Sequence, residues 1–224
     1  VRRRIDSLSS IFKLSVTKNP CVTPEVHLAL KRMYRSKGRM QHQATPLTKK
    51  HLNKMLEVCG TDTRGIRDQV LLRLGYETMR RRSELCEFKF SDLQYLPGNR
   101  KAINLRFSKT DQFGYGKLIP ISTKLFNKIN TWHELVGDSS FILRGVKKGG
   151  TITNSYTPVS LSRRLQELQQ IAGIELHNKF TGHSFRVGAA LDLLAAGYTF
   201  EQIMMKGGWK SESTVIRYLR SWQF

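Results

Sequence analysis

At positions 182–190 the chain reads Gly-His-Ser-Phe-Arg-Val-Gly-Ala-Ala, a run of small and apolar residues that predicts a helix beginning at Ser184. His183 and Arg186 are three positions apart at the start of this helix, so their side chains face the same way. A phosphate placed there would meet the planar fork of Arg186, a donor from His183 and the positive end of the helix dipole. For an isolated pattern, the simpler interpretation is that His183 caps the helix and Arg186 lies in solvent. The surrounding sequence therefore decides between the two.

Two aromatic residues follow this helix. Gly197 is expected to end it, and residues 199–202 form a capping box for a short helix that the Gly207-Gly208 pair ends. Trp209 comes next, and Tyr218 follows nine residues later. The indole N–H of Trp209 can donate to a phosphate oxygen, and the phenol of Tyr218 can attack phosphorus. The plainer alternative is that both are core residues on a terminal helix.

Upstream, periodicity and capping residues predict a mainly α fold with a small three-stranded antiparallel β-sheet, an α+β class. Apolar residues recur at helical spacing in several segments, whereas the period changes to two after Tyr95. Pro97-Gly98-Asn99 is the expected first turn of the β-meander. Helices are predicted to begin at Thr23-Pro24 (ending at Gly38), Thr48, Thr63, Ser122, Ser160 and Ser184, and strands to include 103–107 and 118–121.

The charge balance indicates a polyanionic partner. The 224 residues include 38 Lys and Arg against 17 Asp and Glu, a formal net charge of +21. Basic side chains that neutralise phosphates release condensed counterions, which favours nucleic acid. No apolar run approaches the roughly 20 residues of a spanning helix, so no membrane partner is expected. Three scattered cysteines and scattered histidines suggest a reducing compartment and no zinc site.

We expect three parts along the chain. Residues 1–17 resemble the end of an upstream helical domain that binds DNA, residues 18–22 form a linker, and residues 23–224 form a catalytic domain. The polar break at Thr17 to Pro20 is the basis for the linker.

Taken together, residues 182–190, 196–197, 203–204 and 207–209 with Tyr218 closely resemble the C-terminal end of the tyrosine recombinases, and within them the Cre-like members. Residues 74–85 are similar to the family's first arginine motif, in which the catalytic arginine precedes a glutamate by three positions. That rule selects Arg81, with Glu84 as a supporting residue. Lys109 occupies the place of the family's lysine between the second and third strands. Many relatives carry histidine where this chain has Trp209, but Cre-like members carry tryptophan.

The resemblance implies a site-specific recombinase that cleaves and rejoins DNA through a 3′-phosphotyrosine at Tyr218, without metal, ATP or any other cofactor. Arg81 and Arg186 would bind the phosphate, and His183 and Trp209 would donate to it. Lys109 would protonate the leaving oxygen. The expected partner is double-stranded DNA with a specific target site, bound by a homo-tetramer of subunits that are monomeric when free. A cytoplasmic, nucleoid-associated protein of bacterial, phage or plasmid origin is expected.

Residues that contact DNA outside the catalytic set are predicted on two helices. Arg163 and Arg164 lie in the first turn of the helix expected from Ser160, where Arg163 could bind a guanine edge or a phosphate and Arg164 a phosphate. Lys31, Arg32 and Arg35 are expected to contact the DNA backbone, although a solvated basic face is nearly as good an interpretation.

Two other functions remain open from the sequence. A sequence-specific DNA-binding protein without catalysis would leave Arg81, Lys109 and Tyr218 with no joint purpose. A type IB topoisomerase would use a similar set of residues, but as a monomer with no requirement for paired sites.

Overall fold

The structure is a computed structural model that describes residues 1–38, 43–107, 114, 116–137, 140–209 and 211–219, with only the backbone at 214 and 217–219. The chain divides into two compact units, Val1–Gln43 and Ala44–Phe224.

The first unit contains α1 (Arg2–Phe12), the 3-10 helix η1 (Pro20–Val22) and α2 (Pro24–Lys37). As predicted, α2 begins with proline after Thr23 and ends before Gly38, which has a φ of 73°. The Asn19 side chain donates to the carbonyl oxygen of Ser9 at 3.2 Å and to its hydroxyl at 2.9 Å. Residues 18–22 are therefore held against α1. The boundary between compact units falls after Gln43, whereas the sequence suggested a linker at 18–22.

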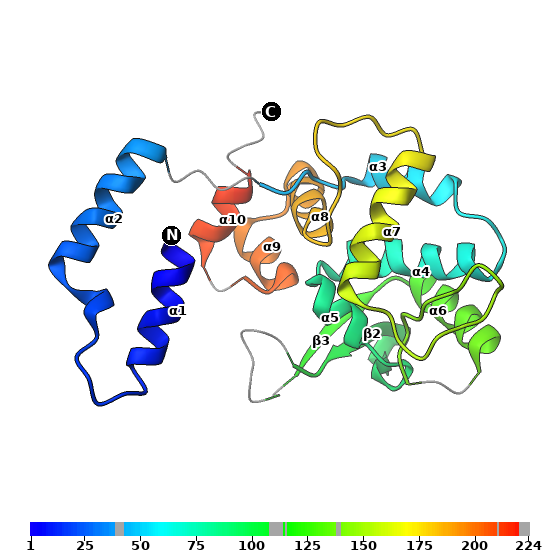
Figure 1. Cartoon of the computed structure of the whole chain (residues 1–224). Helices are drawn as coiled ribbons and strands as arrows, with labels where there is room; N and C mark the ends of the chain where they lie inside the picture. The colour runs from blue at the N-terminus through cyan, green and yellow to red at the C-terminus, as the bar shows by residue number, and fades with distance from the viewer. Residues whose placement is uncertain (39–42, 108–113, 115, 138–139, 210, 220–224) are drawn as a thin grey trace. The chain divides into compact units, whose positions relative to one another are not determined.

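The second unit is mainly helical, as predicted. Ser122 caps α6 with its hydroxyl, and Thr199 forms the capping box predicted for α9. Its helices are α3 (Lys49–Glu57), α4 (Thr63–Thr78), α5 (Arg82–Glu87), α6 (Thr123–Val136), α7 (Pro158–Ile171), α8 (Ser184–Ala195), α9 (Phe200–Gly207) and α10 (Glu212–Leu219) (Figure 1).

One helix begins earlier than predicted. Thr157 caps α7 by accepting a hydrogen bond from the backbone N–H of Ser160 at 3.1 Å, and Pro158 is its first residue. The sequence placed the start at Ser160, so Arg163 and Arg164 lie in the second turn rather than the first. Threonine followed by proline is the same start signal that predicted α2 correctly.

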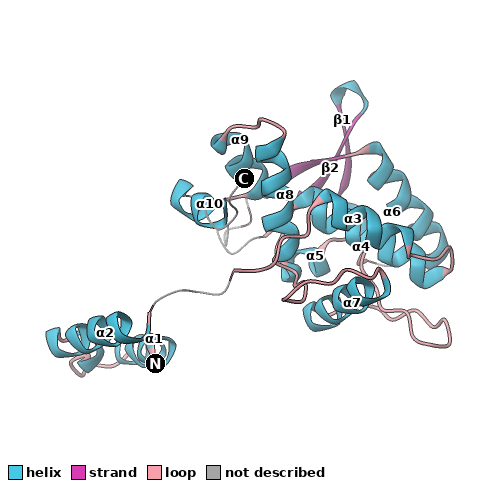
Figure 2. Ribbon diagram, turned by 90° about the horizontal axis from the view of Figure 1, so that it is seen from above, coloured by secondary structure: helices cyan, strands magenta, loops and turns pink. Residues whose placement is uncertain are grey.

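The sheet is three-stranded and antiparallel with the order β1-β2-β3, formed by β1 (Leu93–Leu96), β2 (Arg100–Leu105) and β3 (Lys117–Ile121). Leu93 pairs with Ile103, and Lys101 pairs with Ile121. The turn between β1 and β2 is the short 3-10 helix at Pro97–Asn99, where the prediction placed it. The strands lie beside α6 (Figure 2).

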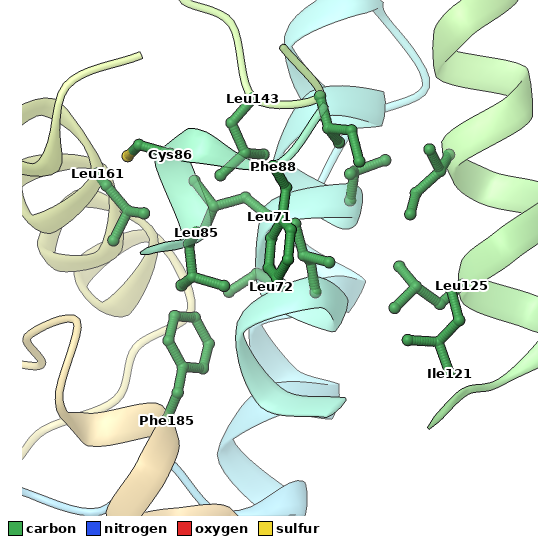
Figure 3. Close-up of a cluster of buried hydrophobic side chains, with 14 of the residues drawn as sticks. Leu71, Leu72, Leu85, Cys86, Phe88, Ile121, Leu125, Leu143, Leu161 and Phe185 are labelled. Carbon is green, nitrogen blue, oxygen red and sulfur yellow. The ribbon is translucent and has the colours of Figure 1, made fainter. Parts of the chain in front are cut away.

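The core is built around α4, whose residues Val70, Leu71, Leu72 and Leu74 are all fully buried. The buried residues of α4 also include two charged ones, Arg67 and Asp68, so the helix is covered by its neighbours over much of its surface. Figure 3 shows the side chains that converge on α4 from its neighbours: Leu85 of α5, Leu125 of α6, Leu161 of α7 and Phe185 of α8.

A second apolar cluster lies on the other side of α8. It contains Met79, Val187, Ala189, Ala190, Leu191, Ile203 and Val215. It joins α8 to α9 and α10, which pack against α8 and against each other (Figure 1). Helix α8 is therefore fixed between the main core and the C-terminal helices.

Candidate active site

The start of α8 is the centre of the candidate site. His183 occupies the N-cap position of α8, and its side chain makes no capping hydrogen bond. Its backbone N–H donates to the hydroxyl of Thr181 at 3.2 Å, and the Ser184 hydroxyl accepts from the Thr181 N–H at 2.9 Å. These bonds hold the backbone turn that precedes α8.

Arg186 is buried, with only 1% of its surface exposed. The interpretation that places this arginine in solvent is therefore wrong. Its guanidinium carbon lies 4.6 Å from the centroid of the Trp209 ring, in a cation–π arrangement. A buried guanidinium of fixed orientation is suited to bind a phosphate in one defined position.

Arg81 is held at the start of α5 by Glu84. The Glu84 carboxylate accepts from the Arg81 backbone N–H at 3.1 Å and from its guanidinium Nη1 at 2.6 Å. Glu84 is buried at 7% exposure, whereas 31% of the Arg81 side chain remains exposed. Glu84 thus fixes the direction of a guanidinium that solvent, or a ligand, can still reach.

A close backbone approach brings α5 and α8 together. A Cβ atom built on Gly182 would lie 2.5 Å from the Cβ of Arg82, a separation that only glycine permits. Gly182 precedes His183 and Arg82 follows Arg81, so this contact sets the two functional residues beside each other. A pocket of about 450 Å³ opens beside Arg81, lined also by Glu84, Lys89 and Arg106 among others.

The pKa of His183 reflects its burial and the positive charges near it. Burial, and then the positive charges of Arg186 and Arg81, lower its pKa from 6.5 to about 4. The imidazole is therefore neutral at neutral pH and can accept a proton. A phosphate bound between the two arginines would offset their charge and raise this pKa again.

Trp209 and Tyr218 belong to the C-terminal part of the site. A Cβ at Gly207 would lie 1.9 Å from the Trp209 ring, so the glycine at the end of α9 leaves the space that the indole fills. Tyr218 is in the last turn of α10, which Val215 anchors in the second apolar cluster. The Tyr218 side chain and the whole of Lys109 lie outside the described residues.

The structure thus brings together Arg81, Glu84, His183, Arg186 and Trp209. The predicted DNA-contact residues belong to other helices. Arg163 is exposed on α7, and Lys31, Arg32 and Arg35 are exposed on α2 of the first unit.

Arg164 has a different environment from the one expected. Its Nε and Nη2 donate to the buried carboxylate of Asp68 at 2.9 and 2.8 Å, and its Nη1 donates to Glu167 at 2.8 Å. Arg67 donates to the same carboxylate from the other side at 2.8 Å. Arg164 therefore joins α7 to α4 within the fold, and a phosphate contact there would compete with two carboxylates.

Sequence reasoning gave no role to Arg80 or Lys117. Arg80 is only 3% exposed, and it donates to the backbone at the end of α9, as does Lys117. The available signal for Arg80 was its position directly after Met79, which adopts a left-handed conformation at the end of α4. The partners are far apart in the sequence, so spacing could not have identified them.

Among the described residues, no helix combines the length and the apolar character needed to cross a bilayer.

Comparison with known families gives one match, which covers most of the second unit. The model described as the phage integrase family matches residues 45–223.

Curated relatives are similar along most of this chain. Recombinase cre of Escherichia phage P1 is 22% identical over 240 residues, covering 99% of this chain and 70% of the relative. The integrase/recombinase xerD homolog of Selenomonas ruminantium is 29% identical over 231 residues, covering 98% and 67%. Tyrosine recombinase XerA of Pyrococcus furiosus is 30% identical over 175 residues, covering 78% and 56%. The chain is therefore shorter than each of these proteins.

Solved structures share the fold. A lambda integrase dimer bound to a COC' core site has a TM-score of 0.66 at 18% identity, covering 98% of this chain and 59% of that one. XerA recombinase has a TM-score of 0.62 at 21% identity, covering 97% and 76%. XerH bound to a palindromic difH substrate, in a post-cleavage complex, has a TM-score of 0.63 at 17% identity, covering 80% and 50%.

Proposed function

Because the chain belongs to the phage integrase family of tyrosine-type recombinases, we propose that it cleaves and rejoins DNA strands at a specific site through a covalent bond to Tyr218. The observation that carries this proposal is the convergence of two arginines, a neutral histidine and an indole at the start of α8. Tyr218 is on a helix that packs against the same α8.

The two arginines would stabilise the charge of the reacting phosphate. In the pentacoordinate transition state, negative charge builds on the non-bridging oxygens. Arg186 is buried and Arg81 is fixed by Glu84, so both cations are oriented before the substrate arrives. Such preorganised donors are effective because little reorganisation is needed during the reaction. The indole N–H of Trp209 would add a neutral donor.

The proton balance uses three residues. The Tyr218 oxygen attacks phosphorus and forms a 3′-phosphotyrosine, while the bond from phosphorus to the 5′-oxygen breaks. The phenol proton passes to the neutral imidazole of His183, and Lys109 gives a proton to the leaving 5′-oxygen. The phosphotyrosine keeps the energy of the broken ester, so attack by a 5′-hydroxyl reverses the step without ATP. No metal or cofactor takes part in this scheme.

We further propose that the substrate is double-stranded DNA with a specific target site, consistent with the net charge of +21. Two solved relatives are bound to DNA sites, one of them as a dimer. A homo-tetramer on two duplexes, formed from monomers, and a cytoplasmic, nucleoid-associated location follow as parts of the same proposal.

A suicide-substrate experiment tests the proposal. The chain and its Tyr218→Phe variant are incubated with nicked duplex fragments that tile the DNA around the encoding gene, with and without EDTA. A denaturing gel should show a protein–DNA adduct with the wild type only, and EDTA should not affect it. If DNA is bound tightly but no fragment gives an adduct, the chain is a DNA-binding protein without catalysis.

The alternative enzymatic function, that of a type IB topoisomerase, predicts a different experimental result. A type IB topoisomerase would relax supercoiled plasmid that lacks the target site, at the same rate as plasmid that carries it. The recombinase proposal predicts that adducts and strand exchange require the target site.

A further inference from the structure

The C-terminal end of α9 is held by two cationic side chains from distant parts of the second unit. Nη2 of the Arg80 guanidinium donates to the carbonyl oxygen of Lys206, and Nε donates to the carbonyl oxygen of Thr78 at 2.7 Å. The ammonium of Lys117 donates to the carbonyl oxygen of Met205. Carbonyls in the last turn of a helix lack helical partners and carry the negative end of its dipole, so cations are favoured there.

The two cations lie close enough to influence each other. Burial and the charge of Arg80 lower the pKa of Lys117. Arg80 itself is 3% exposed. Removing a guanidinium from water is costly unless its donors find partners, and the carbonyl oxygens of Lys206 and Thr78 accept from two of its nitrogens. Two like charges are thus brought together by one helix terminus.

This helix end is next to the candidate active site. It continues directly into Gly208 and Trp209, and the indole of Trp209 lies on Arg186. Gly208 has a φ of 69°, and a Cβ there would lie 2.7 Å from Nη1 of Arg80. Arg80 therefore contacts the turn that directs Trp209, and it precedes Arg81 in the chain.

We propose that Arg80 and Lys117 are positioning residues, which fasten the C-terminal end of α9 so that Trp209 is held against Arg186 beside Arg81. Arg80 fastens it from the turn after α4, and Lys117 from the first position of β3. Neither residue touches the reacting phosphate. The inference rests on the proposed function for its effect on cleavage, but the position of the indole can be measured without DNA.

The first measurement is a fluorine NMR spectrum of the full chain labelled with 5-fluorotryptophan. The Trp209 resonance is assigned with Trp209→Phe, and the resonance of Trp132, fully buried in the main core, serves as an internal reference. Arg80→Met and Lys117→Met should shift or broaden the Trp209 resonance and leave that of Trp132 unchanged. Arg100→Met is the matched control, because Arg100 is exposed and donates to a nearby carbonyl, that of Pro97.

The second measurement is the single-turnover rate of adduct formation on the nicked duplex fragment that the wild type cleaves. We expect Arg80→Met to be slower by roughly tenfold or more, because a charge-assisted bond is lost. The loss for Lys117→Met should be smaller, since that side chain is more exposed, and Lys117→Arg should restore the rate. DNA affinity should change little in all of them. A purely structural role would instead lower thermal stability and DNA affinity together.

The possible results test the positioning role of Arg80 and Lys117 separately from the proposed function. An unchanged Trp209 resonance in both variants, or rates that differ from Arg100→Met by less than about twofold, overturns the positioning role. A wild-type chain that gives no adduct overturns the proposed function. The spectrum then still decides whether Arg80 and Lys117 hold the indole in place.

Discussion

Replacing Glu84 by glutamine should slow DNA cleavage without unfolding the protein. One carboxylate oxygen of Glu84 accepts from the backbone N–H of Arg81, and the other accepts from its guanidinium. The amide oxygen of glutamine can keep the backbone bond and so preserve the start of α5. Its amide NH₂ would then face another donor, and the Arg81 guanidinium would lose its fixed direction.

The expected decrease in cleavage rate is estimated from the solvent exposure of the Arg81–Glu84 ion pair. A hydrogen bond between charged groups contributes about 1.5–3 kcal/mol. Because 31% of the Arg81 side chain is exposed, solvent screens the interaction, and we take about 1–2 kcal/mol. If that free energy is lost from the transition state, cleavage slows by about 5–30-fold. The free energy of unfolding should fall by no more than about 2 kcal/mol, because only the side-chain bond is lost and the backbone bond is kept.

The assay compares single-turnover adduct formation by Glu84→Gln with that by Glu134→Gln, which neutralises an exposed glutamate on α6. Urea denaturation of both variants measures their stability. A Glu84→Gln rate within about twofold of the control would refute the claim that Glu84 orients Arg81 for catalysis. So would a loss of rate fully explained by a loss of folded protein.

Three further predictions concern the fold and its pH dependence. Asp68→Asn should lower the free energy of unfolding by about 3–5 kcal/mol, since it leaves buried Arg67 and partly buried Arg164 without their shared carboxylate. A loss below about 1 kcal/mol in urea denaturation would contradict this. Gly188→Ala should destabilise the fold by more than about 2 kcal/mol, because the new Cβ would lie 1.9 Å from the backbone oxygen of Leu47, whereas Gly149→Ala, with open space around it, should be nearly neutral. Equal melting temperatures for the two glycine variants would show that the close approach is absent. In the unfolded chain His183 takes up a proton below about pH 6.5, but in the fold it stays neutral down to about pH 4, so the unfolding free energy should fall as the pH drops between these values. Urea titrations at about pH 7.5 and about pH 5 should show a smaller fall for His183→Gln than for the wild type, and identical falls would argue against the depressed pKa.

Elements with local signals were predictable from the sequence. The capping box at Thr199 and the proline after Thr23 identified helix starts, because caps involve residues within one turn. The resemblance to the family's first arginine motif selected Arg81, whose catalytic role stays a prediction. Glu84 is three positions after Arg81, and the structure shows that it pairs with that arginine.

Contacts between residues far apart in the sequence could not be predicted. Arg164 was expected to meet phosphate, but its partner Asp68 lies 96 positions earlier in the chain. Asp68 directly precedes the apolar positions 70–72 of α4, which was a hint that it is buried, and a buried carboxylate requires a partner. Arg80 and Lys206 are 126 positions apart in the chain, and the hydrophobic periodicity of the sequence cannot predict such a contact.

The predicted linker at residues 18–22 also has contacts that its composition does not indicate. The polar stretch at residues 18–22 has the composition of a linker, yet a single asparagine side chain ties it to α1. Composition predicts which segment of a chain lacks the apolar periodicity of a helix. It does not predict whether side chains hold that segment against neighbouring elements.

The most direct test of the account is to map the covalent link in the protein–DNA adduct. The adduct from the nicked duplex is digested with protease and nuclease, and the modified peptide is sequenced by mass spectrometry. The account predicts one modified residue, Tyr218, joined to the 3′-phosphate of the cleaved strand, with a free 5′-hydroxyl on the released strand. A link at any other residue, or to a 5′-phosphate, would contradict it.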